Sequence, residues 1–137
     1  DQRFQAFSQR IADAEKAWDE KMKAYRGIKV VTYHRSWPNL ARRFGLNVVG
    51  YVEPRAGIPP SPAHLVELIA LMKRENVKVI LVEPYFDLKT PQSVGQQTGA
   101  QVVVLLPSVG GEKEVTDYFK LFDYDVNLLV RAFQAAR

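Results

Sequence analysis

The 137-residue sequence contains no cysteine and only two histidines. Without cysteine, thiolate zinc sites, thiol catalysis and disulfide bonds are all excluded. No apolar run approaches the roughly 20 residues that a helix needs to span a bilayer, so we expect no membrane insertion. Residues 1–27 carry charges throughout and lack the apolar segment of a signal peptide. We therefore expect the chain to begin as a mature protein or as an excised piece of one.

The rest of the composition is that of a globular domain, with 47% hydrophobic and 25% charged residues. The net charge of +4 is spread along the chain, and its densest pair is Arg42 and Arg43 on a predicted helix. Nucleic-acid-binding proteins usually gather such residues on one face among aromatic side chains. We therefore predict a solvated, mildly basic surface and no nucleic-acid partner.

Residues 2–26 have the pattern of one long amphipathic helix that ends before Gly27. Its apolar positions recur every three or four residues: Phe4, Phe7, Ile11, Ala14, Trp18, Met22 and Tyr25. A helix of about 25 residues is about 37 Å long, which is more than a domain of this size needs. We therefore predict a linking helix over residues 1–27 and an α/β domain over residues 28–137.

Four β-branched runs follow, each leading into a helical pattern. The predicted strands are 29–33, 47–52, 78–83 and 101–106, and the predicted helices are 38–44, 62–76, 91–97 and 115–133. Ser61 and Thr90 are the predicted N-caps of the second and third of these helices. The strands are continuously apolar, as in parallel sheets that are covered on both faces. The sequence thus predicts an α/β fold with a four-stranded, parallel, doubly wound sheet flanked by helices.

Ionisable residues follow the predicted strands, where open parallel sheets bind their ligands. His34 follows the first strand, Glu53 the second, and Glu83 and Asp87 the third, whereas Pro107-Ser108 follows the fourth. The residues alone leave two readings open: a binding site, or loop residues that cap turns and pair with nearby cations. The second histidine, His64, is expected to face solvent from a helix.

Nucleotide binding and hydrolysis are both disfavoured. Residues 34–38 are too bulky for a dinucleotide fingerprint, and no phosphate-binding GxxxxGK[ST] loop is present. No GxSxG elbow surrounds Ser36 or Ser108. Glu83 and Asp87 could act as an acid–base pair only if burial raised one pKa, and the sequence shows no such burial. We therefore predict that the chain is not an enzyme.

Residues 30–46, VVTYHRSWPNLARRFGL, resemble a segment of the zinc- and manganese-binding solute-binding proteins of ABC importers (cluster A-I). In that family a strand ends in a histidine, and the next helix ends in Phe/Tyr-Gly-Leu. Further similarities follow in the same order: the proline-rich loop 53–62, VILVEPYF at 79–86, Thr-Gly-Ala at 98–100 and Asp-Tyr-Phe at 117–119. The resemblance extends over about residues 3–134.

The resemblance implies two lobes joined by a long helix, with a metal ion held between them. Two histidines of the N-terminal lobe and two ligands of the C-terminal lobe hold the ion, and His34 matches the histidine of the C-terminal lobe. The chain would then be the C-terminal lobe of a periplasmic or surface-anchored protein. That protein would capture zinc, or manganese, and deliver it to an ABC permease.

The chain departs from this family at the fourth ligand. Many members carry an aspartate after the last strand, where this chain has Pro107-Ser108. A water, Glu83 or Asp87 would have to complete the coordination. The histidines of the other lobe are absent from these 137 residues, so the lobe alone is expected to bind zinc weakly or not at all. The chain is expected to form a homo-oligomer through its uncovered linking helix.

An unrelated flavodoxin-like signalling or enzyme domain is the alternative interpretation. A receiver-type domain begins at its first strand and carries acidic residues at the end of that strand. This chain has a long preceding helix and His34 instead. These two features favour the metal-transport module.

Overall fold

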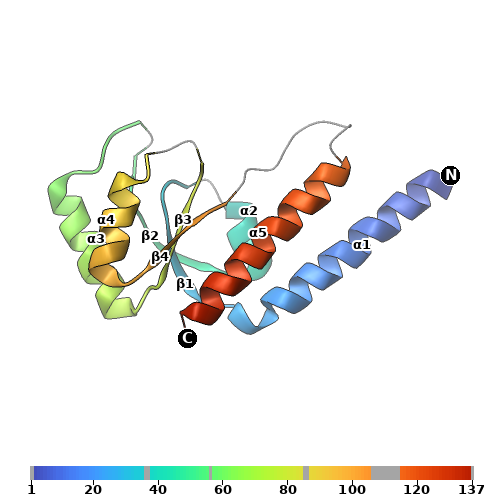
Figure 1. The fold of residues 1–137 in the computed structure, drawn as a ribbon, viewed down its shortest axis with the longest axis horizontal. Helices are drawn as coiled ribbons and strands as arrows, with labels where there is room; N and C mark the ends of the chain where they lie inside the picture. The colour runs from blue at the N-terminus through green and yellow to red at the C-terminus, as the bar shows by residue number, and fades with distance from the viewer. Residues whose placement is uncertain (1, 36–37, 56, 85–86, 106–114, 137) are drawn as a thin grey trace.

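The structure, a computed structural model, describes residues 2–35, 38–55, 57–84, 87–105 and 115–136. Strands and helices alternate after a long first helix, as predicted (Figure 1). The elements are α1 (Gln2–Met22), a 3-10 turn (Lys23–Tyr25), β1 (Lys29–Thr32), α2 (Pro38–Phe44), β2 (Asn47–Tyr51), α3 (Pro62–Glu75), β3 (Val79–Val82), α4 (Lys89–Thr98), β4 (Gln101–Val104) and α5 (Val115–Ala135). No helix in the described ranges is both long and apolar enough to cross a membrane.

The four strands form one parallel sheet in the order β2-β1-β3-β4. The chain runs from β1 outwards to β2 and then crosses back past β1 to β3. The direction of winding therefore reverses between β1 and β3, where Val31 pairs with Ile80. In open parallel sheets this reversal leaves a crevice at the carboxyl ends of the two strands. The predicted fold class is confirmed, and its switch point lies between β1 and β3.

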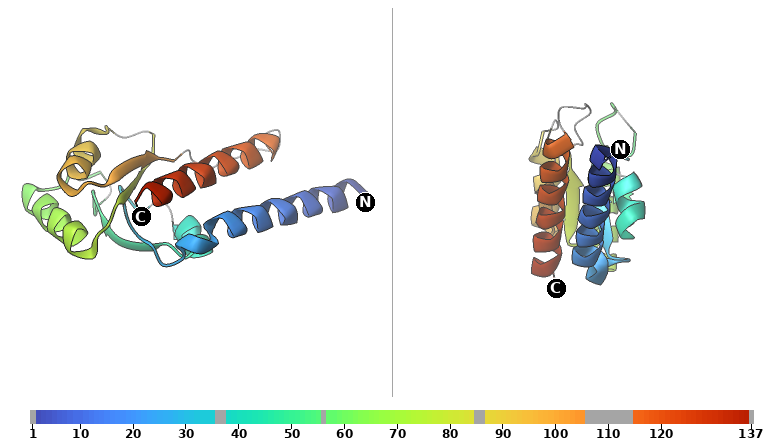
Figure 2. Two further views of the ribbon diagram at one scale, coloured as in Figure 1. Left: turned by 60° about the horizontal axis from the view of Figure 1, so that its bottom comes forward. Right: turned by 90° about the vertical axis from the view of Figure 1, so that its right-hand side faces the viewer.

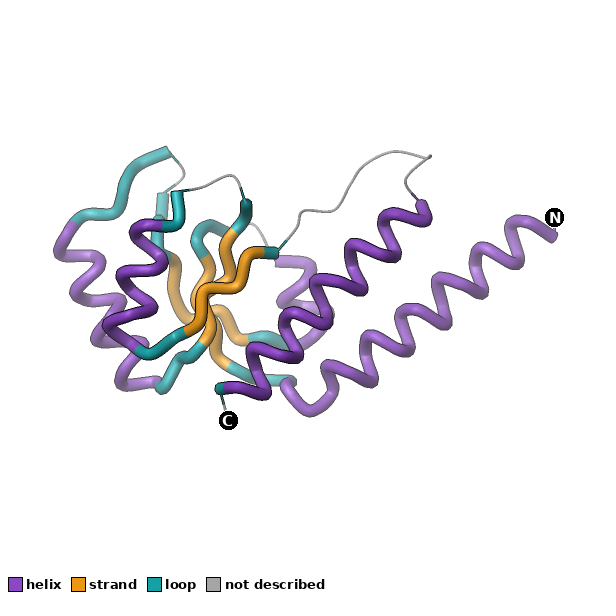
Figure 3. Tube along the Cα trace, in the orientation of Figure 1, coloured by secondary structure: helices purple, strands orange, loops and turns teal. Residues whose placement is uncertain are grey.

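Helices cover both faces of the sheet (Figures 1 and 3). One buried cluster joins the sheet to α1, α2 and α5, and the other joins it to α3 and α4. Val30 and Leu81 belong to the first cluster, whereas their neighbours Val31 and Ile80 belong to the second. Successive side chains of a strand point to opposite faces, so a strand covered on both sides needs apolar residues throughout.

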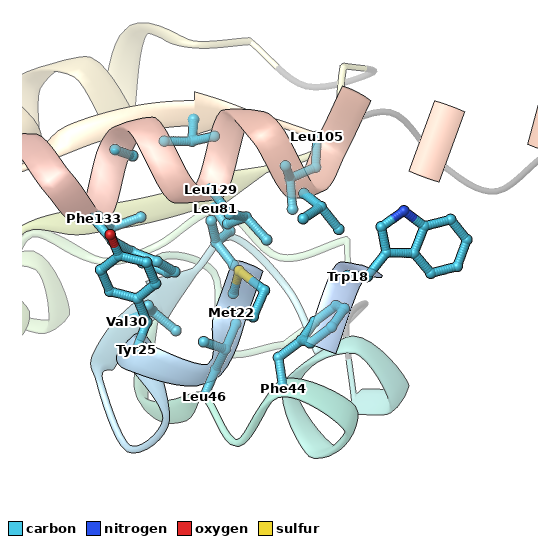
Figure 4. Close-up of a cluster of buried hydrophobic side chains, with 14 residues drawn as sticks. Trp18, Met22, Tyr25, Val30, Phe44, Leu46, Leu81, Leu105, Leu129 and Phe133 are labelled. Carbon is cyan, nitrogen blue, oxygen red and sulfur yellow. The ribbon is translucent and has the colours of Figure 1, made fainter. Parts of the chain in front are cut away.

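Helix α1 contacts the domain mainly through its C-terminal half. Trp18 and Met22 are buried, whereas residues 2–10 are exposed. The helix lies beside α5, and its N-terminal half extends beyond the sheet (Figure 2). Figure 4 shows Trp18 and Met22 in the cluster that also contains Leu129 and Phe133. The remaining apolar positions of the stripe include Phe4, which is 69% exposed, and Phe7, which is 36% exposed.

The predicted caps have different outcomes. Ser61 caps α3, because its hydroxyl accepts a hydrogen bond of 3.1 Å from the His64 N–H. Thr90 was the wrong choice for α4, which already begins at Lys89. There the carboxylate of Asp87 accepts the Lys89 N–H at 2.9 Å, so an upstream residue satisfies the first free donor of the helix.

Candidate metal centre

The carboxyl ends of β1 and β2 hold two polar side chains next to each other. Backbone hydrogen bonds continue beyond the strands: the Tyr33 N–H donates to the Leu81 carbonyl, and the Glu53 N–H donates to the Tyr33 carbonyl, both at 2.9 Å. These bonds fix Tyr33 and Glu53 in register at the edge of the sheet. The Thr32 hydroxyl donates to the His34 carbonyl at 2.6 Å, and this hydrogen bond fixes the turn that carries His34.

His34 and Glu53 meet at this edge. Nε2 of His34 lies 2.9 Å from Oε1 of Glu53, and the two side chains are only 14% and 10% exposed. The same oxygen accepts the Gly57 N–H at 3.0 Å, and the Tyr33 hydroxyl also donates to the Glu53 carboxylate. The Tyr33 ring packs edge-on against the imidazole, with 4.8 Å between the centroids. The carboxylate is therefore held by donors from three residues.

The charges of the site follow from these contacts. The hydrogen bond with His34, followed by those from Tyr33 and Gly57, lowers the pKa of Glu53 although burial opposes this shift. Burial raises the pKa of Tyr33, and the hydrogen bond to Glu53 and the negative charges of Glu53 and Asp87 raise it further. At neutral pH the site thus contains an ionised carboxylate, a neutral phenol and an imidazole.

Glu83 and Asp87, the two carboxylates predicted from the sequence, lie at the same edge but are not joined to His34. Glu83 follows β3, and its Oε1 is buried with no hydrogen-bond partner among the described residues. Asp87 is exposed and its carboxylate accepts the Lys89 N–H. Within the described ranges, no three or more His, Asp or Glu side chains are close enough to hold a metal ion. Pro107-Ser108 lies outside the described residues.

The expectation for His64 was wrong. This histidine is half-buried, and its Nε2 lies 2.7 Å from the carbonyl oxygen of Tyr51. Because that oxygen is an acceptor, the contact requires a proton on Nε2. His64 therefore ties α3 to the end of β2, and this contact gives it a structural role.

Glu53 and Tyr33 are the site residues that sequence reasoning did not select. Glu53 follows a predicted strand, as Glu83 and Asp87 do, but the sequence does not show in which order the strands lie in the sheet. Once β2 is known to lie beside β1, residues that follow these two strands must be neighbours. Strand order was therefore the missing information.

The side-chain atoms at this edge are of types that can act as ligands of a divalent metal ion. A neutral imidazole nitrogen and a carboxylate oxygen are both ligands of zinc, and manganese also accepts carboxylates. Glu83 Oε1, buried and without a hydrogen-bond partner among the described residues, adds a further acceptor at the end of β3. The edge thus presents atoms of the kinds that ligate metal ions, although two neighbouring ligands are only half of a tetrahedral shell.

The chain matches known proteins of metal uptake. Residues 1–132 match the family described as zinc-uptake complex component A, periplasmic. Over 112 residues the chain is 30% identical to the high-affinity zinc uptake system protein ZnuA of Bacillus subtilis. This match covers 79% of the present chain and 34% of the Bacillus subtilis protein. The family and its relatives are transport proteins rather than enzymes, as predicted.

Two solved structures are also similar. The solute-binding protein FpvC of Pseudomonas aeruginosa, in complex with Mn²⁺, has a TM-score of 0.77 and 27% identity, covering 97% of this chain and 50% of its own. The laminin-binding protein Lbp of Streptococcus pyogenes has a TM-score of 0.69 and 26% identity, covering 93% of this chain and 49% of its own. The chain thus spans a third to a half of the length of these relatives. It belongs to the family of the periplasmic component A of zinc-uptake complexes.

Proposed function

We propose that this chain is the C-terminal lobe of a two-lobed solute-binding protein that captures zinc or manganese. The proposed protein works outside the cytoplasm, in the periplasm or anchored at the cell surface, and delivers the ion to the membrane permease of an ABC importer. Family membership over residues 1–132 supports this proposal, and so does the chain's coverage of about half of the solved relatives. In this proposal residues 1–27 are the linking helix and residues 28–137 the lobe.

The observation that carries the proposal is the position of His34. Its imidazole lies at the carboxyl end of β1, beside the switch point of the sheet, and contacts a carboxylate. A ligand at this edge faces away from the sheet, as required for an ion held between two lobes. His34 is thus the proposed histidine ligand of this lobe, and Glu83 and Asp87 are the carboxylates that the sequence offers as its partner.

The flavodoxin-like alternative has no comparable support. Strand order 2-1-3-4 is shared with that class, so the fold does not separate the two readings. The family match and the exposed half of α1 favour the transport protein.

Calorimetry on the proposed two-lobed protein tests this function. His34→Ala is expected to weaken zinc binding at least about tenfold, the scale at which loss of even an outer metal-site contact is felt. His64→Ala is the matched control, because it removes the other histidine from the same edge. Unchanged zinc and manganese affinity in His34→Ala would show that the site lies elsewhere.

A further inference from the structure

Glu53 is a buried, hydrogen-bonded carboxylate that lies beside His34. Its side chain is 10% exposed at the end of β2, and its carboxylate contacts Nε2 of His34. Burying a carboxylate is unfavourable unless hydrogen bonds or charges compensate, and here three residues supply them. The chain thus keeps a buried carboxylate oxygen beside His34.

The two atoms lie close to the separation of two ligands of one ion. Zinc binds imidazole nitrogen and carboxylate oxygen at about 2.0–2.2 Å, so two such ligands of a tetrahedral ion lie roughly 3.3 Å apart. Nε2 of His34 and Oε1 of Glu53 are 2.9 Å apart, a hydrogen-bond distance, so the two side chains would have to separate by about a few tenths of an ångström and turn their lone pairs towards the ion. His34 and Glu53 would then be the two residues of this lobe that hold the ion.

Neighbouring groups hold the carboxylate in position for this role. The Tyr33 hydroxyl donates to it, and so does the Gly57 N–H. Gly57 has a φ of +78°, a conformation that favours glycine, and this turn points its N–H back towards Glu53. Such outer contacts commonly orient metal-binding carboxylates.

We propose that Glu53 is the carboxylate that this lobe contributes beside His34 to a divalent metal ion. This inference rests on the proposed function and replaces Glu83 and Asp87 in that role. Asp87 is exposed and already accepts the Lys89 N–H, and neither it nor Glu83 forms a group of three with His34 and Glu53. Glu53 also supplies the carboxylate that Pro107-Ser108 cannot.

Zinc titration of the 137-residue chain, followed by NMR, tests this assignment at the level of single residues. The ring signals of His34 and the carboxylate carbon of Glu53 are expected to shift together with one apparent Kd. Glu53→Gln keeps the shape and the acceptor oxygen but replaces an anionic ligand by an amide, so the apparent Kd should rise at least about tenfold. Glu75→Gln is the control, because Glu75 pairs with Lys29 at the opposite edge of the sheet.

The outcomes separate the two proposals. If Glu53→Gln binds zinc like the wild type while His34→Ala loses binding, Glu53 only orients the imidazole and the inference is wrong, although the proposed function stands. If Glu83→Gln, and not Glu53→Gln, raises the Kd, the inference is again overturned alone. If His34→Ala binds zinc with the same Kd as the wild type, both the proposed function and the inference about Glu53 are wrong. Amide spectra without zinc report whether each variant is folded.

Discussion

The imidazole of His34 and the carboxylate of Glu53 are 2.9 Å apart although 19 positions separate them in the sequence. They meet because β2 lies beside β1, with both strands ending at the same edge of the sheet. The contact brings together an imidazole nitrogen and a carboxylate oxygen, two kinds of atom that ligate divalent metal ions in proteins.

The isolated chain is expected to bind zinc weakly. Two neighbouring protein ligands are half of a tetrahedral shell, and most of the affinity of a zinc site depends on four preorganised ligands. Calorimetry should therefore give a zinc Kd at least about a hundredfold weaker for residues 1–137 than for the proposed two-lobed protein. Tight one-to-one binding by the monomeric chain would contradict the two-lobed site.

Trp18 is expected to be the main anchor of α1. It is 4% exposed, its ring centroid lies 4.3 Å from that of Phe122, and its Nε1–H donates to Asp123 at 3.2 Å. Trp18→Ala should lower the free energy of unfolding by about 3–5 kcal/mol, as for other large-to-small core substitutions. Urea denaturation measures this change.

The matched control for Trp18→Ala is Phe4→Ala on the same helix. Phe4 is 69% exposed, so its loss should change the free energy of unfolding by no more than about 0.5 kcal/mol. Equal effects of the two substitutions would mean that α1 does not pack on the domain through its C-terminal half.

Self-association through α1 is the next expectation. Phe4 and Phe7 lie on the exposed half of the helix, and each large apolar side chain left in water forgoes about 1.5–3 kcal/mol of burial. Light scattering over a concentration series should show a rising mean mass for the wild type. The double variant Phe4→Glu/Phe7→Glu should remain monomeric. A wild-type chain that stays monomeric throughout would refute this expectation.

The ion pair at the opposite edge of the sheet should make stability depend on pH. Lys29 Nζ lies 2.6 Å from Glu75 Oε2, and this hydrogen bond is the main cause that lowers the pKa of Glu75 below its ordinary 4.5. A lowered folded-state pKa gives stabilisation that is present above the ordinary pKa and is lost as the pH falls through the folded value. The effect is small because both side chains are more than a third exposed.

Lys29→Gln tests this linkage by thermal unfolding at two pH values. The variant should be slightly less stable than the wild type at about pH 7, and the difference should shrink as the pH falls and Glu75 becomes protonated in the folded state. A difference of the same size at both pH values would show that Lys29 acts through packing and not through its charge.

Much of the fold could be predicted because its signals are local. Continuous apolar strands, Ser61 before Pro62 and the helix-ending glycines all depend on neighbouring residues. The predicted strands run one or two residues beyond the observed ones: Tyr33 still donates to Leu81, past the end of β1 at Thr32. The start of α4 was misplaced because Asp87, rather than Thr90, satisfies its first N–H.

The site was harder to predict because it depends on strand order. The sequence identified His34 and the edge on which it lies, but it did not show that Glu53 is its neighbour. The structural contact of His64 was missed for a similar reason, because its acceptor, the Tyr51 carbonyl, belongs to β2 and not to its own helix. Contacts between elements follow from topology, and one sequence carries little information about topology.

His34 is the proposed histidine ligand of this lobe. A crystal structure of the zinc-loaded two-lobed protein, with anomalous data collected at the zinc edge, tests this role without relying on a variant. We expect an anomalous peak about 2.0–2.1 Å from a ring nitrogen of His34, at the carboxyl end of β1. A fully occupied zinc peak elsewhere, with His34 coordinating nothing, would contradict it.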